Sequence, residues 1–234
     1  MMKEKDELQM SLLEHLDDLR KHIIKAVVGI ILFSMVSFLI AEPVLELLAR
    51  PIGGLDKLQS IAVTENITII MKVSFLCGFV FSFPYTLFQV LTFIFPALKS
   101  KEKRYFLFFL PMGTLFFLSG VAFAYFVMLP SAIPFLVGIL NVQTLPRLDN
   151  YFQFVLSLIF WLGISFESPL LILFLAKMKI ITAKQLLKNW KIAIVIIAIL
   201  SAVITPTGDP INMALFMAPL IVLYLLSIFF AAFA

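Results

Sequence analysis

The sequence has few charged residues and almost no cysteine. Of its 234 residues, 62% are apolar and 14% are charged, and the mean hydropathy is +1.08. Soluble globular domains average about 45–50% apolar and about 25% charged residues. The composition therefore excludes a soluble protein and predicts one polytopic membrane domain over residues 1–234. Because Cys77 is the single cysteine, an intrachain disulfide is excluded as well.

Motifs for enzymatic chemistry are also missing. The sequence holds no G-x-x-x-x-G-K-[ST] loop, no G-x-S-x-G turn and no H-E-x-x-H pair. His15 and His22 have no third ligand at metal spacing. We therefore predict a non-enzyme without a metal or cofactor. The net charge of +4 does not indicate nucleic-acid binding, because the basic residues gather at the ends of apolar segments.

Long apolar segments dominate what remains. About 20 apolar residues cross the hydrocarbon core as a helix, so the sequence predicts an all-α protein with six transmembrane helices. The N-terminus is polar and lacks an adjacent apolar core, which argues against a cleaved signal peptide. The predicted spans are residues 23–41, 73–95, 105–129, 151–176, 192–204 and 211–234. The fifth is short, and it crosses fully only with flanking residues or in a thinned bilayer.

Lysine and arginine are unequally divided between the two sides of these spans. Five lie before or at the start of the first span, four in the loop after the second and five in the loop after the fourth, which places fourteen on one side. The other side holds four: Arg50, Lys57, Lys72 and Arg147. Because cytoplasmic loops carry the excess of basic residues, both termini are predicted to be cytoplasmic.

Prolines lie within or beside the predicted spans. Each interior proline removes one backbone hydrogen bond and kinks its helix. Ordinary kinking of membrane helices explains them, and a concave scaffold of curved helices is the functional alternative. These prolines are Pro84, Pro96, Pro111, Pro169, Pro206, Pro210 and Pro219.

One acid lies inside an apolar span. Glu167 is the only charged residue between 151 and 176, and a charge at membrane depth costs about 2.5–3.5 kcal/mol on insertion scales. An acid kept there has a partner, water or a function. One interpretation is a polar site for a partner helix, and the alternative is a proton-coupled small-solute transporter that uses Glu167. The scarcity of other buried polar groups counts against the transporter.

A short amphipathic helix is predicted before the first span, over residues 11–22. On this helix Asp17 has Lys21 four residues on, so its charge is locally balanced. Asp18 instead lies between Glu14, a like charge, and His22. A solvated acidic face is the simplest interpretation. The alternative is that Asp18, whose charge is not balanced on this helix, binds a ligand.

Several short motifs, in order along essentially the whole chain, resemble those of one family. Each is weak alone, and their order makes the set specific. They are His15 to Lys21 (HLDDLRK), Thr64 and Glu65 followed by Lys72, Pro84 to Gln89 (PYTLFQ), Phe93 to Leu98 (FIFPAL), Glu102 to Arg104 (EKR), Phe123 to Phe126 (FAYF), Ser165 to Pro169 (SFESP), and Thr205 and Pro206 followed by Asp209. The chain thereby resembles the TatC family, the multi-spanning receptor subunit of twin-arginine protein translocases.

This resemblance implies a function for the acids. Two cytoplasmic carboxylates in the family contact the Arg-Arg pair of signal peptides, and they correspond here to Asp18, where the family has Glu, and to Glu102. Phe93 and Pro96 would shape the same surface. Glu167 would contact the single-span partners TatA and TatB.

The resemblance also implies the cellular setting. It predicts a receptor and scaffold in the cytoplasmic (inner) membrane that exports folded proteins with the proton-motive force. It leaves open whether the chain forms a homo-oligomer. Glu65 and Asp209 are further candidates for a structural or functional role.

Overall fold

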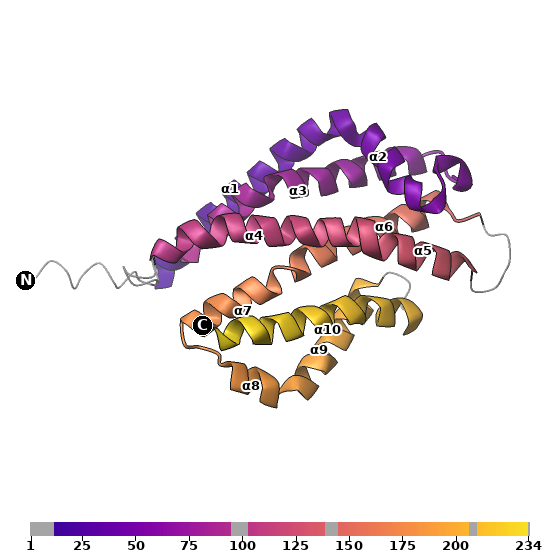
Figure 1. Cartoon of the computed structure of the whole chain (residues 1–234). Coiled ribbons are helices and arrows are strands. Elements are labelled where there is room, and N and C mark those ends of the chain that lie inside the picture. Colours follow the sequence, from indigo (N-terminus) through magenta and orange to yellow (C-terminus); the bar gives the residue numbers. More distant parts are fainter. Residues whose placement is uncertain (1–11, 95–102, 139–144, 206–209, 234) are drawn as a thin grey trace, which may run out of the picture. The chain divides into compact units, whose positions relative to one another are not determined.

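The structure is a computed structural model that describes residues 12–94, 103–138, 145–205 and 210–233. The regular elements in these ranges are helical, apart from one isolated β-bridge between Gln59 and Arg147. The predicted all-α class is thus confirmed (Figure 1). The elements are α1 (Leu12–Ser37), η2 (Phe38–Ile40), α2 (Ala41–Ala49), η3 (Arg50–Ile52), η4 (Leu55–Lys57), α3 (Glu65–Ile94), α4 (Lys103–Phe123), η6 (Ala124–Met128), α5 (Leu129–Gly138), α6 (Leu148–Ser165), α7 (Ser168–Lys177), α8 (Ala183–Lys188), α9 (Trp190–Ile204) and α10 (Pro210–Ala232).

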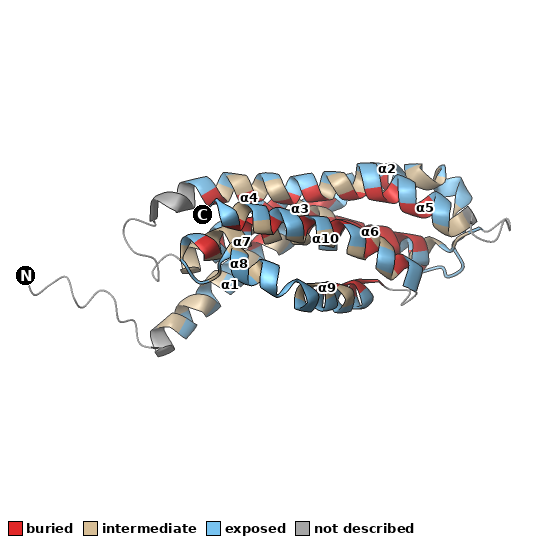
Figure 2. Cartoon of the chain, turned by 60° about the horizontal axis from the view of Figure 1, so that its bottom comes forward, coloured by how far each residue is buried: buried red, intermediate tan, exposed pale blue. Residues whose placement is uncertain are grey.

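The apolar helices match a membrane setting. Within the described ranges, five helical stretches are long and apolar enough to cross a membrane, and α9 is a shorter apolar helix. Exposed residues occur along all of these helices (Figure 2). Many of them are large and apolar, for example Leu39 and Val203. In lipid such side chains need no burial, because the hydrocarbon is as apolar as they are. In the described residues, each of the six predicted apolar segments is thus helical, the fourth as two helices.

The chain divides into two compact units. The first comprises residues 1–41 and 74–114, and the second comprises residues 42–73 and 115–234. The long helices α3 and α4 contribute to both units, because the divisions fall within them. Each unit is held together by its own contacts.

In the first unit, α1 packs antiparallel against the second part of α3. Gly78 lies directly against the backbone of Ser34, so that an added Cβ would overlap it. Further toward the N-terminus of α1, His22 bonds to Gln89 of α3. A glycine at this crossing lets the two backbones approach closely, as small residues do at membrane helix interfaces.

In the second unit, α4 and α6 are closely packed at Gly120. A Cβ there would lie 2.9 Å from the carbonyl oxygen of Leu162 and from the Cβ of Phe166. Phe117, fully buried, fills the space beside Gly163 from the other helix. In the same unit, α10 packs against α7, α8 and α9.

Two predicted spans are interrupted in the structure. The sequence predicted the kink at Pro169 in the fourth span, but not the π-helical turn in the third. The predicted fourth span is split between α6 and α7 at Phe166 and Glu167, just before Pro169. The proline has no N–H to continue the ladder, which explains the break. A π-helical turn, η6, interrupts the third span. Such turns occur mostly as single-turn bulges inside α-helices.

Candidate functional site

The acidic face of α1 carries the first candidate site. Asp17 forms the predicted ion pair with Lys21, at 2.8 Å between Oδ2 and Nζ. Asp18 has only a longer contact among the described residues, 3.7 Å from its Oδ1 to Nε2 of His22. Its side chain is 30% exposed. The two neighbouring acids therefore differ, because only Asp17 has a close cation of its own helix.

The neighbours of Asp18 are fixed against α3. His22 places its Nδ1 2.7 Å from Oε1 of Gln89, and Gln89 is buried. One turn before Asp18, the ring of His15 stacks on Phe93, with 4.6 Å between the ring centroids. The part of α1 that bears Asp18 is thus held by two contacts with α3, and one of them brings Phe93 beside His15.

The other members of the predicted signal-peptide site lie outside the described residues. These are Glu102 and Pro96, and Asp209 lies outside as well. The part of the predicted site that the structure brings together is therefore Asp18 and Phe93, joined through His15 and the α1–α3 packing. The grouping of Asp18 with Glu102 stays a prediction.

Glu65, at the start of α3, is the most highly bonded acid in the described chain. Its Oε2 accepts hydrogen bonds from the backbone N–H groups of Ile61, at 2.9 Å, and Ala62, at 3.1 Å. Its Oε1 accepts from Nε of Arg147 at 3.0 Å and from the backbone N–H of Asp149 at 2.9 Å. The side chain is 2% exposed. These partners are all donors, which suits an ionised carboxylate.

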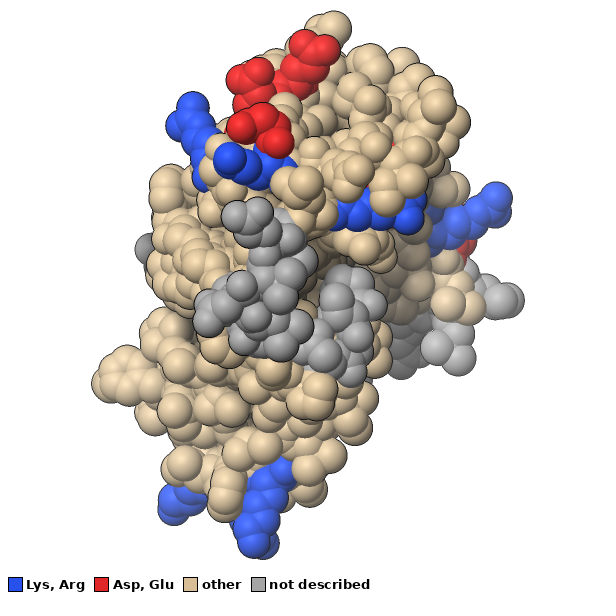
Figure 3. All heavy atoms as spheres, turned by 90° about the vertical axis from the view of Figure 1, so that its right-hand side faces the viewer, with Lys and Arg blue, Asp and Glu red and all other residues tan. Residues whose placement is uncertain are grey.

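Further contacts near Glu65 join the same two chain segments, which are distant in the sequence. Lys72 binds Asp149 with 2.7 Å between Nζ and Oδ1. The backbone of Gln59 exchanges hydrogen bonds with Pro146 and Leu148, at 3.0 and 2.9 Å. Figure 3 shows the face at the right of Figure 1, where acidic and basic side chains lie close together within a largely uncharged surface. Glu65 is therefore placed as a structural clamp between the loop before α3 and the loop before α6.

Glu167 occupies the turn between α6 and α7. Its backbone carbonyl accepts the N–H of Leu171, so it starts α7, but its side chain makes no capping bond. The carboxyl is half-buried and lies near the backbone of Phe117 in α4. Its Oε1 is buried and has no hydrogen-bond partner among the described residues. A buried acceptor without a partner is costly, so this side chain can take a donor from another molecule or carry a proton itself.

Sequence reasoning missed several residues that complete these sites. Gln89 belongs to the quoted motif in α3, but nothing in the sequence tied it to His22. Arg147 and Lys72 counted only toward membrane orientation, although both pair with acids. The relevant signal is the pairing of opposite charges that are distant in the sequence, which no local pattern reveals.

Comparison with known proteins shows which family has this sequence and fold. Residues 14–219 match the family model described as Sec-independent protein translocase protein (TatC). The Sec-independent protein translocase protein TatC of Koribacter versatilis is 38% identical over 227 residues, which is 94% of this chain and 84% of that protein. That of Aquifex aeolicus is 38% identical over 227 residues and 94% of both chains.

Solved structures agree with the sequence relatives. A crystal structure of a twin-arginine translocase receptor, TatC, superposes with a TM-score of 0.85 at 37% identity, covering 94% of this chain and 99% of that one. A second crystal structure of the receptor, in detergent, gives a TM-score of 0.84 at 38% identity.

Fold and comparisons together define a polytopic helical membrane protein of the protein-translocating class. More specifically, the chain belongs to the TatC family of Sec-independent protein translocase proteins.

Proposed function

We propose that this chain is the receptor and scaffold subunit of a twin-arginine translocase. It binds the Arg-Arg pair of signal peptides and recruits single-span subunits of the TatA and TatB type. It exports folded proteins with the proton-motive force and catalyses no reaction itself. It forms one domain of the cytoplasmic (inner) membrane, and both termini face the cytoplasm.

The difference between Asp17 and Asp18 carries this proposal. Lys21 already neutralises Asp17 at 2.8 Å, whereas the contact of Asp18 with His22 is too long for a hydrogen bond. An arginine guanidinium presents paired donors that match a carboxylate, and lysine does not reproduce that geometry. Asp18 is therefore the carboxylate on α1 that a signal-peptide arginine would bind.

The second carboxylate of the proposed site is Glu102, with Phe93 and Pro96 forming its apolar border. Phe93 supports this assignment because it stacks on His15, one turn from Asp18. Two carboxylates for two arginines would balance charge on binding. This balance favours the Arg-Arg pair over a peptide with a single cation.

Glu167 is the proposed contact for the partner helix. Its buried Oε1 lacks a hydrogen-bond partner among the described residues, and a polar side chain of a recruited helix would supply one. Glu65 has a structural role in this proposal, because its bonds fix two loops. Asp209 keeps its proposed structural or functional role.

Photo-crosslinking tests the proposed receptor site directly. A crosslinking residue replaces Lys25, an exposed residue about two helical turns from Asp18 on α1, in the full chain reconstituted in nanodiscs. The pair of Lys21 with Asp17 therefore stays intact. A control carries it at Glu46, an exposed acid of α2. We expect a peptide with the Arg-Arg pair to crosslink at position 25, with little product for a matched Lys-Lys peptide or at position 46. Equal product with both peptides would contradict the proposal.

A further inference from the structure

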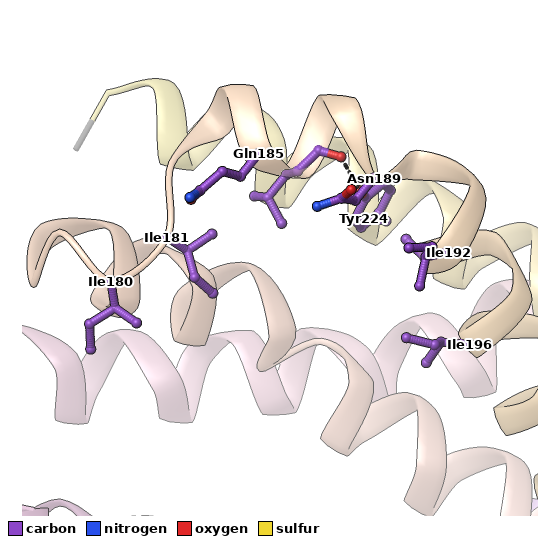
Figure 4. A pocket seen from close by; sticks show the side chains of 9 residues that line it. Ile180, Ile181, Gln185, Asn189, Ile192, Ile196 and Tyr224 are labelled. Carbon is purple, nitrogen blue, oxygen red and sulfur yellow. Dashed lines mark hydrogen bonds between the residues drawn. The ribbon is translucent and has the colours of Figure 1, made fainter.

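An open pocket of about 420 Å³ lies beside α8, in the second unit. It is bounded by the link between α7 and α8, by α8 itself, by the start of α9 and by Tyr224 of α10. Figure 4 shows the side-chain amides of Gln185 in α8 and of Asn189 between α8 and α9, with isoleucines on both sides. The pocket therefore combines an aliphatic surface with a polar edge.

The walls of this pocket are held in place by two sets of hydrogen bonds. Thr182 caps α8, because its Oγ1 accepts the N–H of Gln185 at 3.3 Å and its own N–H bonds to Oε1 of Gln185 at 2.9 Å. Tyr224 donates its hydroxyl to the carbonyl of Leu186 at 2.7 Å, which ties α8 to α10. The pocket is thus a formed feature of the fold.

The segment around the pocket carries charge of one sign. Residues 177–191 contain five lysines and no acid. Three of them, Lys184, Lys188 and Lys191, are exposed and are next in sequence to the pocket residues Gln185, Asn189 and Ile192. Lys179 has a φ of +59°, in the left-handed region that disfavours side chains. A bound anion would balance this concentration of positive charge.

The pocket also lies where the membrane boundary is expected. α9 begins with Trp190 and Lys191, residue types that favour the interface between lipid headgroups and hydrocarbon. Ile196 lies four residues beyond Ile192, which is about 6 Å along the helix. Both isoleucines line the pocket and are more than half exposed. The surroundings of the pocket therefore change along α9, from charged residues at its start to aliphatic residues further on.

We propose that this pocket binds an anionic phospholipid. The phosphate would lie at the lysines and side-chain amides, and the upper acyl chain would lie along Ile192 and Ile196. Basic pockets between transmembrane helices take anionic headgroups in this way. A soluble anion would leave the isoleucines uncovered, and an uncharged helix would offer no charge complementary to Lys184 and Lys188. The proposal does not depend on the receptor function.

Tryptophan fluorescence tests this site because Trp190 directly follows the pocket residue Asn189 in the sequence. The chain has two tryptophans, so Trp161→Phe leaves Trp190 as the single reporter. The full chain is placed in vesicles of phosphatidylcholine with equal fractions of brominated phosphatidylglycerol or brominated phosphatidylcholine, which quench on contact. We expect roughly a tenfold preference for the anionic lipid, in line with the attraction of several lysines to anionic headgroups.

Two variants separate the pocket from general surface charge. Ala193→Phe fills the pocket without changing charge, and Ala202→Phe, at an exposed position of α9, is its control. Lys184→Gln with Lys188→Gln and Lys191→Gln removes three charges. Its control removes three exposed charges elsewhere: Lys25→Gln, Arg50→Gln and Lys57→Gln.

The expected result is loss of the preference in both pocket variants and retention in both controls. Equal quenching by the two brominated lipids in the parent chain would overturn the proposal. A preference that survives Ala193→Phe would also overturn it, because surface charge alone would then explain the attraction. If Ala193→Phe does not fold, the matched pair of charge variants decides the question. If Trp161→Phe does not fold, native mass spectrometry of the unmodified chain and these variants measures retained phosphatidylglycerol instead.

Discussion

Glu65 and Arg147 form an ion pair across 82 residues of sequence, with 3.0 Å between Oε1 and Nε. The carboxylate of Glu65 also accepts hydrogen bonds from backbone N–H groups of both chain segments that it joins. The pair is therefore one part of a clamp in which a single carboxylate satisfies donors of two chain segments. Removing the carboxylate leaves several of these donors without an acceptor at once.

Replacing Glu65 is accordingly expected to destabilise the protein more than replacing any one of its partners. Glu65→Ala should lower the melting temperature in detergent clearly, and Arg147→Ala should lower it less, because the backbone bonds to Glu65 remain. Glu46→Ala removes an exposed acid of α2 and serves as the control. Thermal unfolding of the three purified variants measures the order. Equal melting temperatures for Glu65→Ala and the control would show that the clamp contributes nothing.

Signal-peptide affinity should depend on Asp18 and hardly on Asp17. Asp18→Ala and Glu102→Ala are each expected to weaken binding of an Arg-Arg peptide by about 1.5–3 kcal/mol, the range for a hydrogen bond to a charged group. Asp17→Ala makes the same change of charge and should do less, because Lys21 already pairs with Asp17. Fluorescence anisotropy with a labelled peptide gives the three affinities. Equal losses at positions 17 and 18 would remove the basis of the proposed site.

Glu167 should matter for assembly through its polarity. Interhelical hydrogen bonds in membranes contribute about 0.6–2 kcal/mol, so Glu167→Ala is expected to reduce co-purification of single-span partners. Glu167→Gln keeps a polar side chain and should retain most of it. Neither variant should alter peptide binding at α1. If the alanine variant assembles and exports normally, Glu167 is a tolerated polar residue without a function in assembly.

The charge distribution predicts the orientation in the membrane. In a Cys77→Ser background, cysteine replaces Lys57 in η4 or Lys188 in α8, both of which are exposed. An impermeant maleimide added to intact cells should label position 57 and leave position 188 unlabelled until the membrane is opened. A third cysteine at Ser100 should behave like position 188. Labelling of position 100 from outside would reverse the predicted orientation.

The apolar helices and the family were accessible from sequence because both rest on local information. A span such as α10 can be predicted from its continuous run of apolar residues, which a helix needs to cross the hydrocarbon core. The pairing of Asp17 with Lys21 is equally local, since residues four apart share one face of a helix. The ordered set of motifs along the chain, including those around Asp18 and Glu167, was sufficient to indicate the TatC family.

Contacts between distant segments were decided by the tertiary structure alone. The sequence contains Glu65 and Arg147 but not their proximity, and it counted Arg147 only as a charge beside the membrane. Likewise, the kink at Pro169 was predicted from sequence, but the packing of Phe166 beside it against Gly120 of α4 was not. The pocket beside α8 exists because Tyr224 fixes α8 to α10 across 38 residues. Helix formation is set by neighbours along the chain, whereas the partner of a buried polar group is whichever group folding brings within about 3 Å.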